Sequence, residues 1–376
     1  MRDANSKPKI ALLAMGVIGG GNLGYGIPVL RDLFERLSAH YEIIFYSFST
    51  IDEGNIPQGI KLRQTRLPLP GRLKFLYIAL KFAFDQIFRP SKLIFAISIY
   101  PTGHWAIRLG KIFNRHVLVQ IIALEAVGLT DIGYGNLTVP WLKKITIKVC
   151  EEADTLVAVA GYQMDVAKKS LPTSRNIDVL PLRIDYRKFS YRKRKVSFPV
   201  QFIHVAYYSP IKDQDTMFAA LASVSKKVDC HLTVIGSGYD STSVRDILDR
   251  LQISNLVTFV GEIDQSQVPQ YFRDAHILLH PARFETGCAV IQEAMASGVA
   301  VCGTRVGILS DIGDSYAMIA PPKDPEELAN KIMELINNPA LYDTITSKAY
   351  NWITTYDSMW SYENYRQFID SKLKDL

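Results

Sequence analysis

The sequence contains few cysteines, and their spacing excludes two classes of protein. Four occur among 376 residues, and no two stand in a CxxC pair or beside histidines at a spacing that would close a zinc site. Four unpatterned cysteines are also too few for a fold held together by disulfide bonds. We therefore expect reduced thiols, as is typical of a cytoplasmic protein, and no metal. The four are Cys150, Cys230, Cys288 and Cys302.

The sequence also lacks an uninterrupted apolar run long enough to cross a membrane. A spanning helix needs about 20 apolar residues, and the longest candidate, residues 73–88, contains Lys74, Lys81 and Asp85. The apolar run 10–18 leads into glycines without a small-residue cleavage pattern, which favours a buried strand over a signal peptide. We expect a cytoplasmic protein that can lie peripherally at the inner face of the cytoplasmic membrane.

Acidic residues are scarce in one segment. Residues 61–92 hold eight lysines and arginines against one acid, Asp85. From Gly71 to Phe88 the basic residues alternate with aromatic and apolar ones, as in helices that lie on a membrane. The segment predicts binding to an anionic membrane surface, and a core helix whose lysines reach solvent is the alternative. No recognised binding motif accompanies the charge, so we expect no nucleic-acid partner.

Short apolar runs alternate with amphipathic stretches along the whole chain, which predicts helices packed on parallel sheets. Two successive series of buried strands predict an α/β chain of two doubly wound, Rossmann-like domains. We place the N-terminal domain at 1–185, a charged linker at 186–199, the C-terminal domain at 200–356 and a final helix within 357–376. The predicted strands are 10–15, 42–48, 93–99, 117–123 and 155–159, followed by 202–206, 232–235, 257–260, 277–279, 300–302 and 317–319.

The glycines after the first predicted strand match a dinucleotide-binding fingerprint in spacing only. Gly19, Gly21 and Gly24 have the required spacing. The acidic residue that should end the second strand is missing, because that strand ends in Phe45-Tyr-Ser-Phe-Ser-Thr. We therefore expect no nicotinamide or flavin cofactor, and interpret Gly20 and Gly21 as a flexible loop that lets the backbone approach a ligand in the domain cleft.

Two glutamates eight positions apart mark the strongest candidate site. Glu285 and Glu293 bracket a stretch of small residues that follows a predicted strand and opens a helix. The N–H groups and the positive dipole at such a helix start favour an anionic phosphate. We expect Thr286, Gly287 and Cys288 to form this cradle, and the two carboxylates to accept hydrogen bonds from sugar and ribose hydroxyls.

These residues resemble those of the retaining nucleotide-sugar glycosyltransferases of family 4, whose two-domain fold is called GT-B. The resemblance covers most of the chain and is densest at 179–321. The paired glutamates of the family match Glu285 and Glu293, and its diphosphate-binding lysine matches Lys212 in Ser209-Pro-Ile-Lys-Asp-Gln. The stretch 295–307 resembles the one that follows the glutamates in the family.

The resemblance implies a role for each matching residue. Glu285 would hold the transferred sugar, Glu293 the ribose and Lys212 the phosphates. Gly261 and Val268 would lie near the base of the donor. No metal would be needed, because a lysine and a helix N-terminus can stabilise the departing diphosphate.

The resemblance also implies an arrangement of the domains. The donor would bind the second domain and the acceptor would enter from the first, across a cleft between them. The helix within 357–376 would pack back onto the first domain.

Several positions depart from the family pattern. Tyr207 stands where the family commonly has an arginine, so Arg183 is our candidate for supplying the missing positive charge. Phe95 and Ile122 stand where the family often has histidines on the acceptor side, while Glu125 keeps the family's acid.

His104 follows the predicted strand 93–99 and is our candidate for a third catalytic residue beside Glu285 and Lys212, with a structural histidine as the alternative. The chain is thus predicted to be a retaining hexosyltransferase that uses a nucleoside diphosphate sugar and a glycan or lipid-linked acceptor, in the assembly of a cell-surface polysaccharide or glycolipid. A catalytically degenerate protein that binds a nucleotide sugar or glycan, and a GT-B nucleotide-sugar epimerase, are the alternatives.

Overall fold

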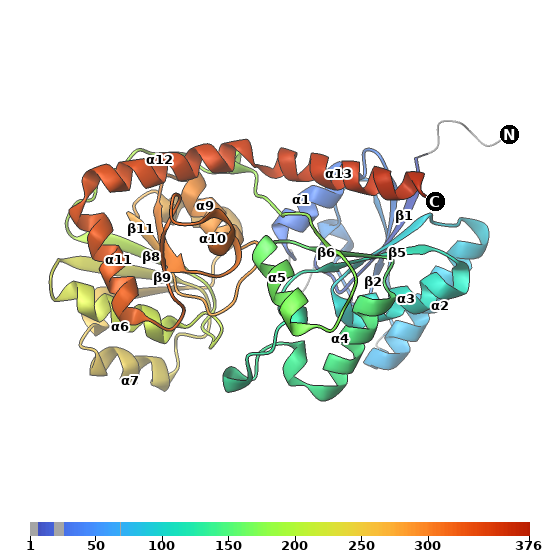
Figure 1. The fold of residues 1–376 in the computed structure, drawn as a ribbon, viewed down its shortest axis with the longest axis horizontal. Helices are drawn as coiled ribbons and strands as arrows, with labels where there is room; N and C mark the ends of the chain where they lie inside the picture. Colours follow the sequence, from blue (N-terminus) through green and yellow to red (C-terminus); the bar gives the residue numbers. More distant parts are fainter. Residues whose placement is uncertain (1–6, 19–25, 68) are drawn as a thin grey trace. The chain divides into compact units, whose positions relative to one another are not determined.

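The computed structural model describes residues 7–18, 26–67 and 69–376, apart from the side chain of Arg72 (Figure 1). The chain divides into two compact units. Unit 1 comprises Met1–Leu182 together with Ser358–Leu376, and unit 2 comprises Arg183–Asp357. Gly20 and Gly21 lie outside the described residues. None of the helices in the described ranges combines the length and apolar content that a membrane-spanning segment requires.

Unit 1 is built on a parallel sheet with the strand order β3-β2-β1-β4-β5-β6-β7. Successive side chains of a strand point to opposite faces of the sheet, so Ala11 and Leu13 of β1 enter one core and Ile10 and Leu12 enter the other. Helices therefore have to cover both faces, and the central strands of the sheet are buried along almost their whole length. The strands are β1 (Lys9–Ala14), β2 (Glu42–Ser47), β3 (Ile60–Arg63), β4 (Leu93–Ile97), β5 (His116–Ile121), β6 (Thr155–Ala158) and β7 (Ile177–Val179).

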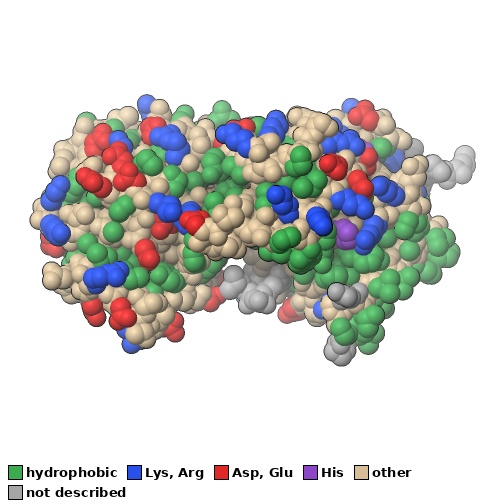
Figure 2. Space-filling view, turned by 60° about the horizontal axis from the view of Figure 1, so that its bottom comes forward, with side chains coloured by type: hydrophobic (Ala, Val, Ile, Leu, Met, Phe, Trp, Pro, Cys, Tyr) green, Lys and Arg blue, Asp and Glu red, His purple; other side chains and the backbone are tan. Residues whose placement is uncertain are grey.

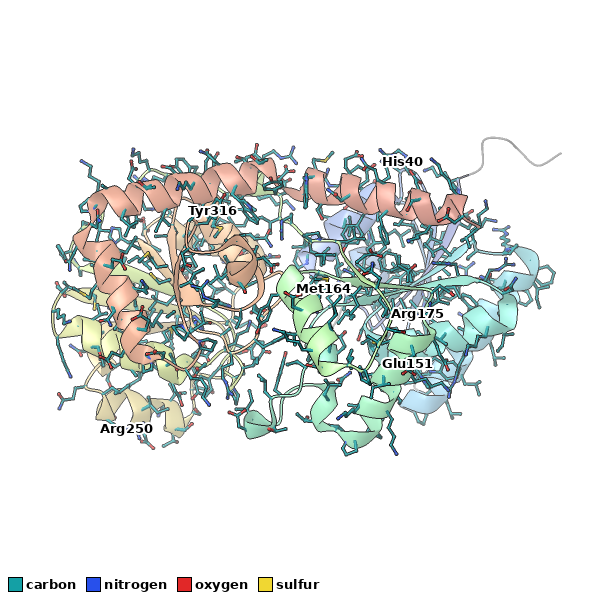
Figure 3. All side chains as sticks on the ribbon, viewed as in Figure 1. His40, Glu151, Met164, Arg175, Arg250 and Tyr316 are labelled. Carbon is teal, nitrogen blue, oxygen red and sulfur yellow. The ribbon has the colours of Figure 1, made fainter. Side chains whose placement is uncertain are left out.

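The helices of unit 1 alternate with the strands, except that β2 and β3 are joined through a short 3₁₀ turn, Glu53–Asn55. They are α1 (Pro28–Leu37), α2 (Gly71–Phe88), α3 (His104–Phe113), α4 (Pro140–Glu152), α5 (Gly161–Ser170) and α13 (Ser358–Lys374). A side-chain hydrogen bond attaches the segment before the short strand β7 to α4. Arg175 Nε donates to the carbonyl oxygen of Glu151 at 3.0 Å (Figure 3).

The C-terminal helix α13 belongs to unit 1 and packs against α1 (Figure 1). Its buried Tyr365 hydroxyl donates to the carbonyl oxygen of Leu180 and accepts from Gln120 Nε2, both at 2.8 Å. Asp370 accepts from the Tyr41 hydroxyl at 2.6 Å. These bonds attach the last helix to the end of β7, to β5 and to the segment before β2.

Unit 2 contains a second parallel sheet with the order β10-β9-β8-β11-β12-β13. The chain runs outwards from β8 to β10, then returns to β11 on the other side of β8. After β8 the chain continues to β9 on one side, and after β11 it continues to β12 on the other side. In sheets of this kind, ligands bind at the point where the strand order reverses in this way. The strands are β8 (Val200–Val205), β9 (Cys230–Ile235), β10 (Val257–Gly261), β11 (Ile277–His280), β12 (Ala300–Thr304) and β13 (Met318–Ala320).

The helices of unit 2 are α6 (Gln214–Ser225), α7 (Thr242–Arg250), α8 (Val268–Phe272), α9 (Ala289–Ala296), α10 (Gly307–Ile312), α11 (Pro325–Asn337) and α12 (Pro339–Thr355). Residues 186–199, expected to form a linker, lie within this unit. Arg194 from this stretch donates to the carbonyl oxygens of Phe272 at 2.8 Å and Ser297 at 2.5 Å. The charged stretch is thus bound to the body of unit 2.

Candidate functional site

Two opposite charges meet at the point in the sheet of unit 2 where the strand order reverses. Lys212 lies in the loop between β8 and α6, and Glu285 lies in the loop between β11 and α9. Because β8 and β11 are adjacent and parallel, both loops leave the same edge of the sheet. Lys212 Nζ donates to Glu285 Oε2, and the Arg283 N–H donates to the carbonyl oxygen of Ile211 at 2.8 Å. A side-chain bond and a backbone bond therefore connect the two loops.

Glu285 is surrounded by donors. Besides Lys212, His280 Nε2 lies 3.2 Å from Oε2, and the Thr286 N–H donates to Oε1 at 3.3 Å. Burial alone would raise the pKa of the Glu285 carboxyl, but Lys212 and His280 outweigh burial and hold the pKa well below its ordinary range. Burial likewise lowers the pKa of Lys212 while Glu285 raises it, and the net shift is upward. The pair is therefore ionised on both sides near neutral pH.

His280 is a site residue that the sequence reasoning missed. It is the last residue of β11, and it is fully buried. Burial lowers its pKa, so the imidazole is neutral near pH 7 and places its proton on Nε2, towards Glu285. Its Nδ1 is buried without a hydrogen-bond partner among the described residues. The sequence signal for this contact is that His280 ends a strand five residues before the glutamate.

Three potential metal ligands also meet here. One atom each of His280, Glu285 and Cys288 lie within 4.8 Å of one another, and nitrogen, oxygen and sulfur ligands suit zinc. The Lys212 ammonium, however, is bonded to the same carboxylate and repels a cation. Burial also raises the pKa of the Cys288 thiol well above its ordinary value, which disfavours its thiolate form. The cluster suits an ion pair better than a metal, and the absence of a metal requirement stays a prediction.

The expected phosphate cradle lies at the start of α9. Cys288 is its N-cap, with a left-handed φ of 31°. Gln292 Nε2 donates to the carbonyl oxygen of Gly287 at 2.7 Å, and the Ile308 N–H donates to that of Thr286 at 2.8 Å. Both carbonyl oxygens are thus held by the protein. A helix start presents its N–H groups along the axis, so this loop is suited to an anion.

Glu293 is a buried carboxyl with one hydrogen-bond donor in the described part of the chain. It lies on α9 and accepts a hydrogen bond from Gln265 Nε2 at 3.1 Å. Burial raises the pKa of Glu293 to about 7. Such a carboxyl has unused acceptor capacity, which hydroxyl groups of a ligand can satisfy.

The two residues expected near the base of a donor lie on neighbouring elements. Gly261 ends β10 with a φ of 83°, and its carbonyl oxygen accepts from the Gly236 N–H at 2.9 Å. A Cβ atom at Gly236 would lie 2.1 Å from the carbonyl oxygen of Ala206, so this turn requires glycine. Val268 is buried as the first residue of α8.

Two further expected donor-site residues differ in accessibility. Tyr207, in the loop after β8, is 53 % exposed. Arg183 is buried, and its guanidinium lies 4.9 Å from the centre of the Trp352 ring in α12. This cation–π contact already engages the arginine, and its contribution to phosphate binding stays a prediction.

The candidate residues of unit 1 lie after β4 and β5. His104 is the first residue of α3, and burial, followed by Arg108 and Lys148, lowers its pKa. It is therefore neutral near pH 7. Ser98, directly after β4, has a φ of 81°, which is strained for a residue other than glycine. No local sequence pattern predicted this strain.

Glu125 is buried in the loop after β5. Its Oε2 accepts from the Ala123 N–H at 2.7 Å, while Oε1 has no hydrogen-bond partner in the described part of the chain. Phe95, one of the positions where the family often has histidine, is fully buried in β4 and packs against Phe34 with ring centres 5.3 Å apart. Ile122 packs against the same core.

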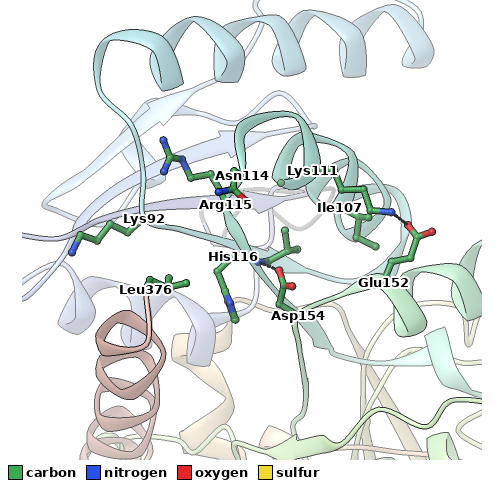
Figure 4. A pocket seen from close by; sticks show the side chains of 11 residues that line it. Lys92, Ile107, Lys111, Asn114, Arg115, His116, Glu152, Asp154 and Leu376 are labelled. Atoms are coloured by element: carbon green, nitrogen blue, oxygen red, sulfur yellow. Dashed lines mark hydrogen bonds and ion pairs between the residues drawn. The ribbon is translucent and has the colours of Figure 1, made fainter.

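A separate hollow of about 530 Å³ lies at the opposite edge of this sheet (Figure 4). It lies at the amino ends of β4, β5 and β6, and both acidic side chains that line it have partners within the protein. Lys111 Nζ pairs with Glu152 at 3.0 Å, and Asp154 accepts from the Val117 N–H at 2.8 Å. None of the described candidate residues lines this hollow.

Most of unit 2 is similar to a known protein family. Residues 188–352 match the model of the family described as glycosyl transferases group 1. N-acetyl-alpha-D-glucosaminyl L-malate synthase of Bacillus anthracis is 23 % identical over 210 residues, which make up 53 % of this chain and 54 % of that protein. The chain thus spans about half the length of the curated relatives it matches. Unit 2 is thus similar to the glycosyl transferases of group 1 over residues 188–352.

Solved structures share the fold over nearly the whole chain. Sucrose-phosphate synthase of Thermosynechococcus elongatus has a TM-score of 0.80 at 16 % identity, with 98 % of this chain and 100 % of that chain covered. HepE of Anabaena, solved in complex with UDP-glucose, has a TM-score of 0.75 at 16 % identity, with 96 % and 99 % covered. The predicted GT-B fold of two Rossmann-like domains is confirmed.

Proposed function

We propose that the chain is a retaining hexosyltransferase of family 4 that moves a sugar from a nucleoside diphosphate sugar to a hydroxyl of a glycan or lipid-linked acceptor. The observation that carries the proposal is the Lys212–Glu285 pair beside the start of α9. It combines a fixed cation, a helix N-terminus and a carboxylate where a sheet of this type binds ligands. The wider role we infer is the assembly of a cell-surface polysaccharide or glycolipid.

In this proposal Lys212 changes partner when the donor binds. Before binding, its ammonium is neutralised by Glu285. The diphosphate would lie against the N–H groups of Gly287 and Cys288. It would then pair with the Lys212 ammonium in place of part of the interaction with Glu285. Glu285 stays oriented by His280 and gains capacity to accept a hydrogen bond from a sugar hydroxyl. The charge that develops on the departing phosphate then meets a cation that is already in place.

The remaining candidate residues would bind the ribose of the donor and the acceptor. Glu293 would accept hydrogen bonds from the ribose hydroxyls, because its buried carboxyl accepts one hydrogen bond from the residues that the structure describes and has room for more. His104 and Glu125 would bind the acceptor on unit 1. The departing phosphate would take the proton of the attacking hydroxyl on the same face of the sugar, which leads to retention. No step needs a metal or a further cofactor.

Calorimetry with a panel of nucleoside diphosphates and their sugars tests the proposal, followed by NMR of the products with and without candidate acceptors. The proposal predicts binding of one donor, slow release of free sugar, and transfer with retained configuration once an acceptor is found. No binding to any member of the panel would overturn it.

The exposed Tyr207, which stands where the family commonly has an arginine, favours a degenerate binding protein as the second candidate. Donor binding without turnover under any acceptor would support this second candidate. Conversion of the donor's sugar without an acceptor would identify an epimerase instead.

A further inference from the structure

Helix α2 presents a row of large apolar side chains to solvent. They recur at intervals of three or four residues, which places them on one side of the helix. Their exposed fractions are large for side chains of this type. The row consists of Leu73 (52 %), Leu76 (48 %), Leu80 (61 %), Phe84 (63 %) and Ile87 (70 %), with Phe88 (67 %) beside it.

The opposite side of the same helix is in the core. Ile78, Ala79 and Phe82 are buried against the sheet of unit 1. At about 100° per residue, these three positions lie across the helix from the exposed row. The helix is therefore apolar on both sides, although the described residues cover only one side. Figure 2 shows hydrophobic side chains gathered on unit 1, at the right of the view.

Lysines border the exposed row on one flank. Lys74 Nζ donates to Thr50 Oγ1 at 3.1 Å, and Lys81 Nζ donates to the carbonyl oxygen of Gln64 at 2.9 Å. Both bonds go to neutral oxygens and leave the charge of each lysine in place. The acid of the helix, Asp85, is paired with Arg63 at 2.9 Å.

Other basic side chains of the segment are neutralised by acids from outside it. Lys61 pairs with Glu42 at 2.6 Å, and Arg66 pairs with Glu53 at 2.5 Å. The net charge of residues 61–92 thus overstates the attraction to an anionic surface. The apolar row, which the charge count does not describe, is the dominant feature.

We propose that the exposed row of α2 inserts into the interfacial layer of a membrane that contains anionic lipids. The helix would lie in the membrane plane, its apolar side among the acyl chains and Lys74 and Lys81 at the phosphates. A contiguous apolar row of this size marks an interaction surface, and the flanking lysines select an anionic one. The proposal goes beyond the transfer reaction and depends on no residue of the donor site.

The experiment is sedimentation of the full chain with vesicles of phosphatidylethanolamine and phosphatidylglycerol, compared with vesicles of phosphatidylcholine. Wild type is expected to bind the anionic vesicles more tightly. The combined change Leu80→Gln, Phe84→Gln and Ile87→Gln should reduce binding at least about tenfold, since each apolar side chain contributes to insertion. Phe198→Gln in unit 2 is the matched control, because Phe198 is exposed to the same 63 % as Phe84.

Circular dichroism checks that the triple variant is folded, which is expected because the three side chains are exposed. Lys74→Gln with Lys81→Gln should weaken binding to the anionic vesicles only, and added salt should have a similar effect. Unchanged binding by the folded triple variant would overturn the proposal. So would a wild type that ignores both kinds of vesicle but forms dimers that the triple variant loses, because the row would then bind a second copy of the chain.

Discussion

At the scale of single residues, the site depends on how Glu285 divides its hydrogen bonds. One oxygen accepts from Lys212 and His280, and the other accepts from the neighbouring backbone. In the proposed reaction the carboxylate therefore has two tasks. It orients the ammonium before the donor arrives, and it holds the sugar afterwards.

Glu285→Gln should separate these tasks. The amide keeps the shape of the side chain but loses the charge, so the sugar is held less well while Lys212 is free to bind phosphate. We expect turnover to fall at least about tenfold, with affinity for the nucleoside diphosphate unchanged or higher. Steady-state kinetics and calorimetry measure the two quantities. An equal loss of turnover and of diphosphate affinity would contradict the assigned role.

Glu293 should make the stability of unit 2 depend on pH. Burial raises the pKa of this carboxyl from 4.5 to about 7, so between these values the folded chain holds a proton that the unfolded chain has released. The contribution of Glu293 to stability is then favourable at low pH and is lost as pH rises through about 7. Glu293→Gln removes this dependence.

We expect the glutamine variant to gain about 2 kcal/mol relative to wild type on going from pH 5 to pH 8. Urea unfolding at the two pH values measures the difference. Glu326→Gln, at an exposed position of α11, is the control and should show little change. A Glu293→Gln variant whose relative stability is the same at both pH values would show that the carboxyl is not buried as described.

At the scale of elements, the start of α10 supports the loop before α9. Gly307 has a φ of 54°, and a Cβ atom there would lie 2.5 Å from the carbonyl oxygen of Thr286. The loop can approach α10 so closely because residue 307 has no side chain. The position of the proposed phosphate cradle therefore depends on a residue that contacts no ligand.

Gly307→Ala should displace the cradle and weaken nucleoside diphosphate binding by about tenfold or more, besides lowering stability. Gly313→Ala is a matched control, because Gly313 also has a positive φ, 76°, but a Cβ atom there would have nothing within 4 Å. The control carries the backbone strain without the collision. If the two variants bind diphosphate equally well, Gly307 does not position the loop.

At the scale of the whole molecule, the chain returns to unit 1 after completing unit 2. The buried Tyr365 hydroxyl attaches the returning helix to unit 1 through hydrogen bonds with Leu180 and Gln120. Tyr365→Phe leaves both partners buried with one bond fewer, which costs about 1–3 kcal/mol.

We expect this loss to lower the unfolding temperature of unit 1 and to spare nucleoside diphosphate binding, which we assign to unit 2. Differential scanning calorimetry and binding calorimetry on the same variant test both statements. Tyr350→Phe, within unit 2, is a useful comparison because its ring contacts Tyr191, with centres 4.0 Å apart. A loss of diphosphate affinity in Tyr365→Phe would contradict the assignment to unit 2.

The sequence by itself determined the buried strands and the resemblance at the donor site. Buried parallel strands are nearly continuous apolar runs, so a local pattern in the sequence indicates their positions. The strands it missed, β3 and β7, are the edge strands of unit 1, and both are short and less buried. A half-exposed strand of three or four residues carries too little pattern to be recognised.

Only the tertiary structure decided which side chains meet. Lys212 and Glu285 are 73 positions apart, and they pair because the strand order makes β8 and β11 neighbours, which no local pattern specifies. His280, by contrast, lies only five positions before Glu285 at the end of β11, so its contact with the glutamate is local. The composition of α2 likewise predicts an apolar helix, but only the packing of unit 1 decides that Ile78 and Phe82 are covered and Phe84 is not. Periodicity reports what a helix contains, whereas burial depends on which neighbour the fold brings to each side.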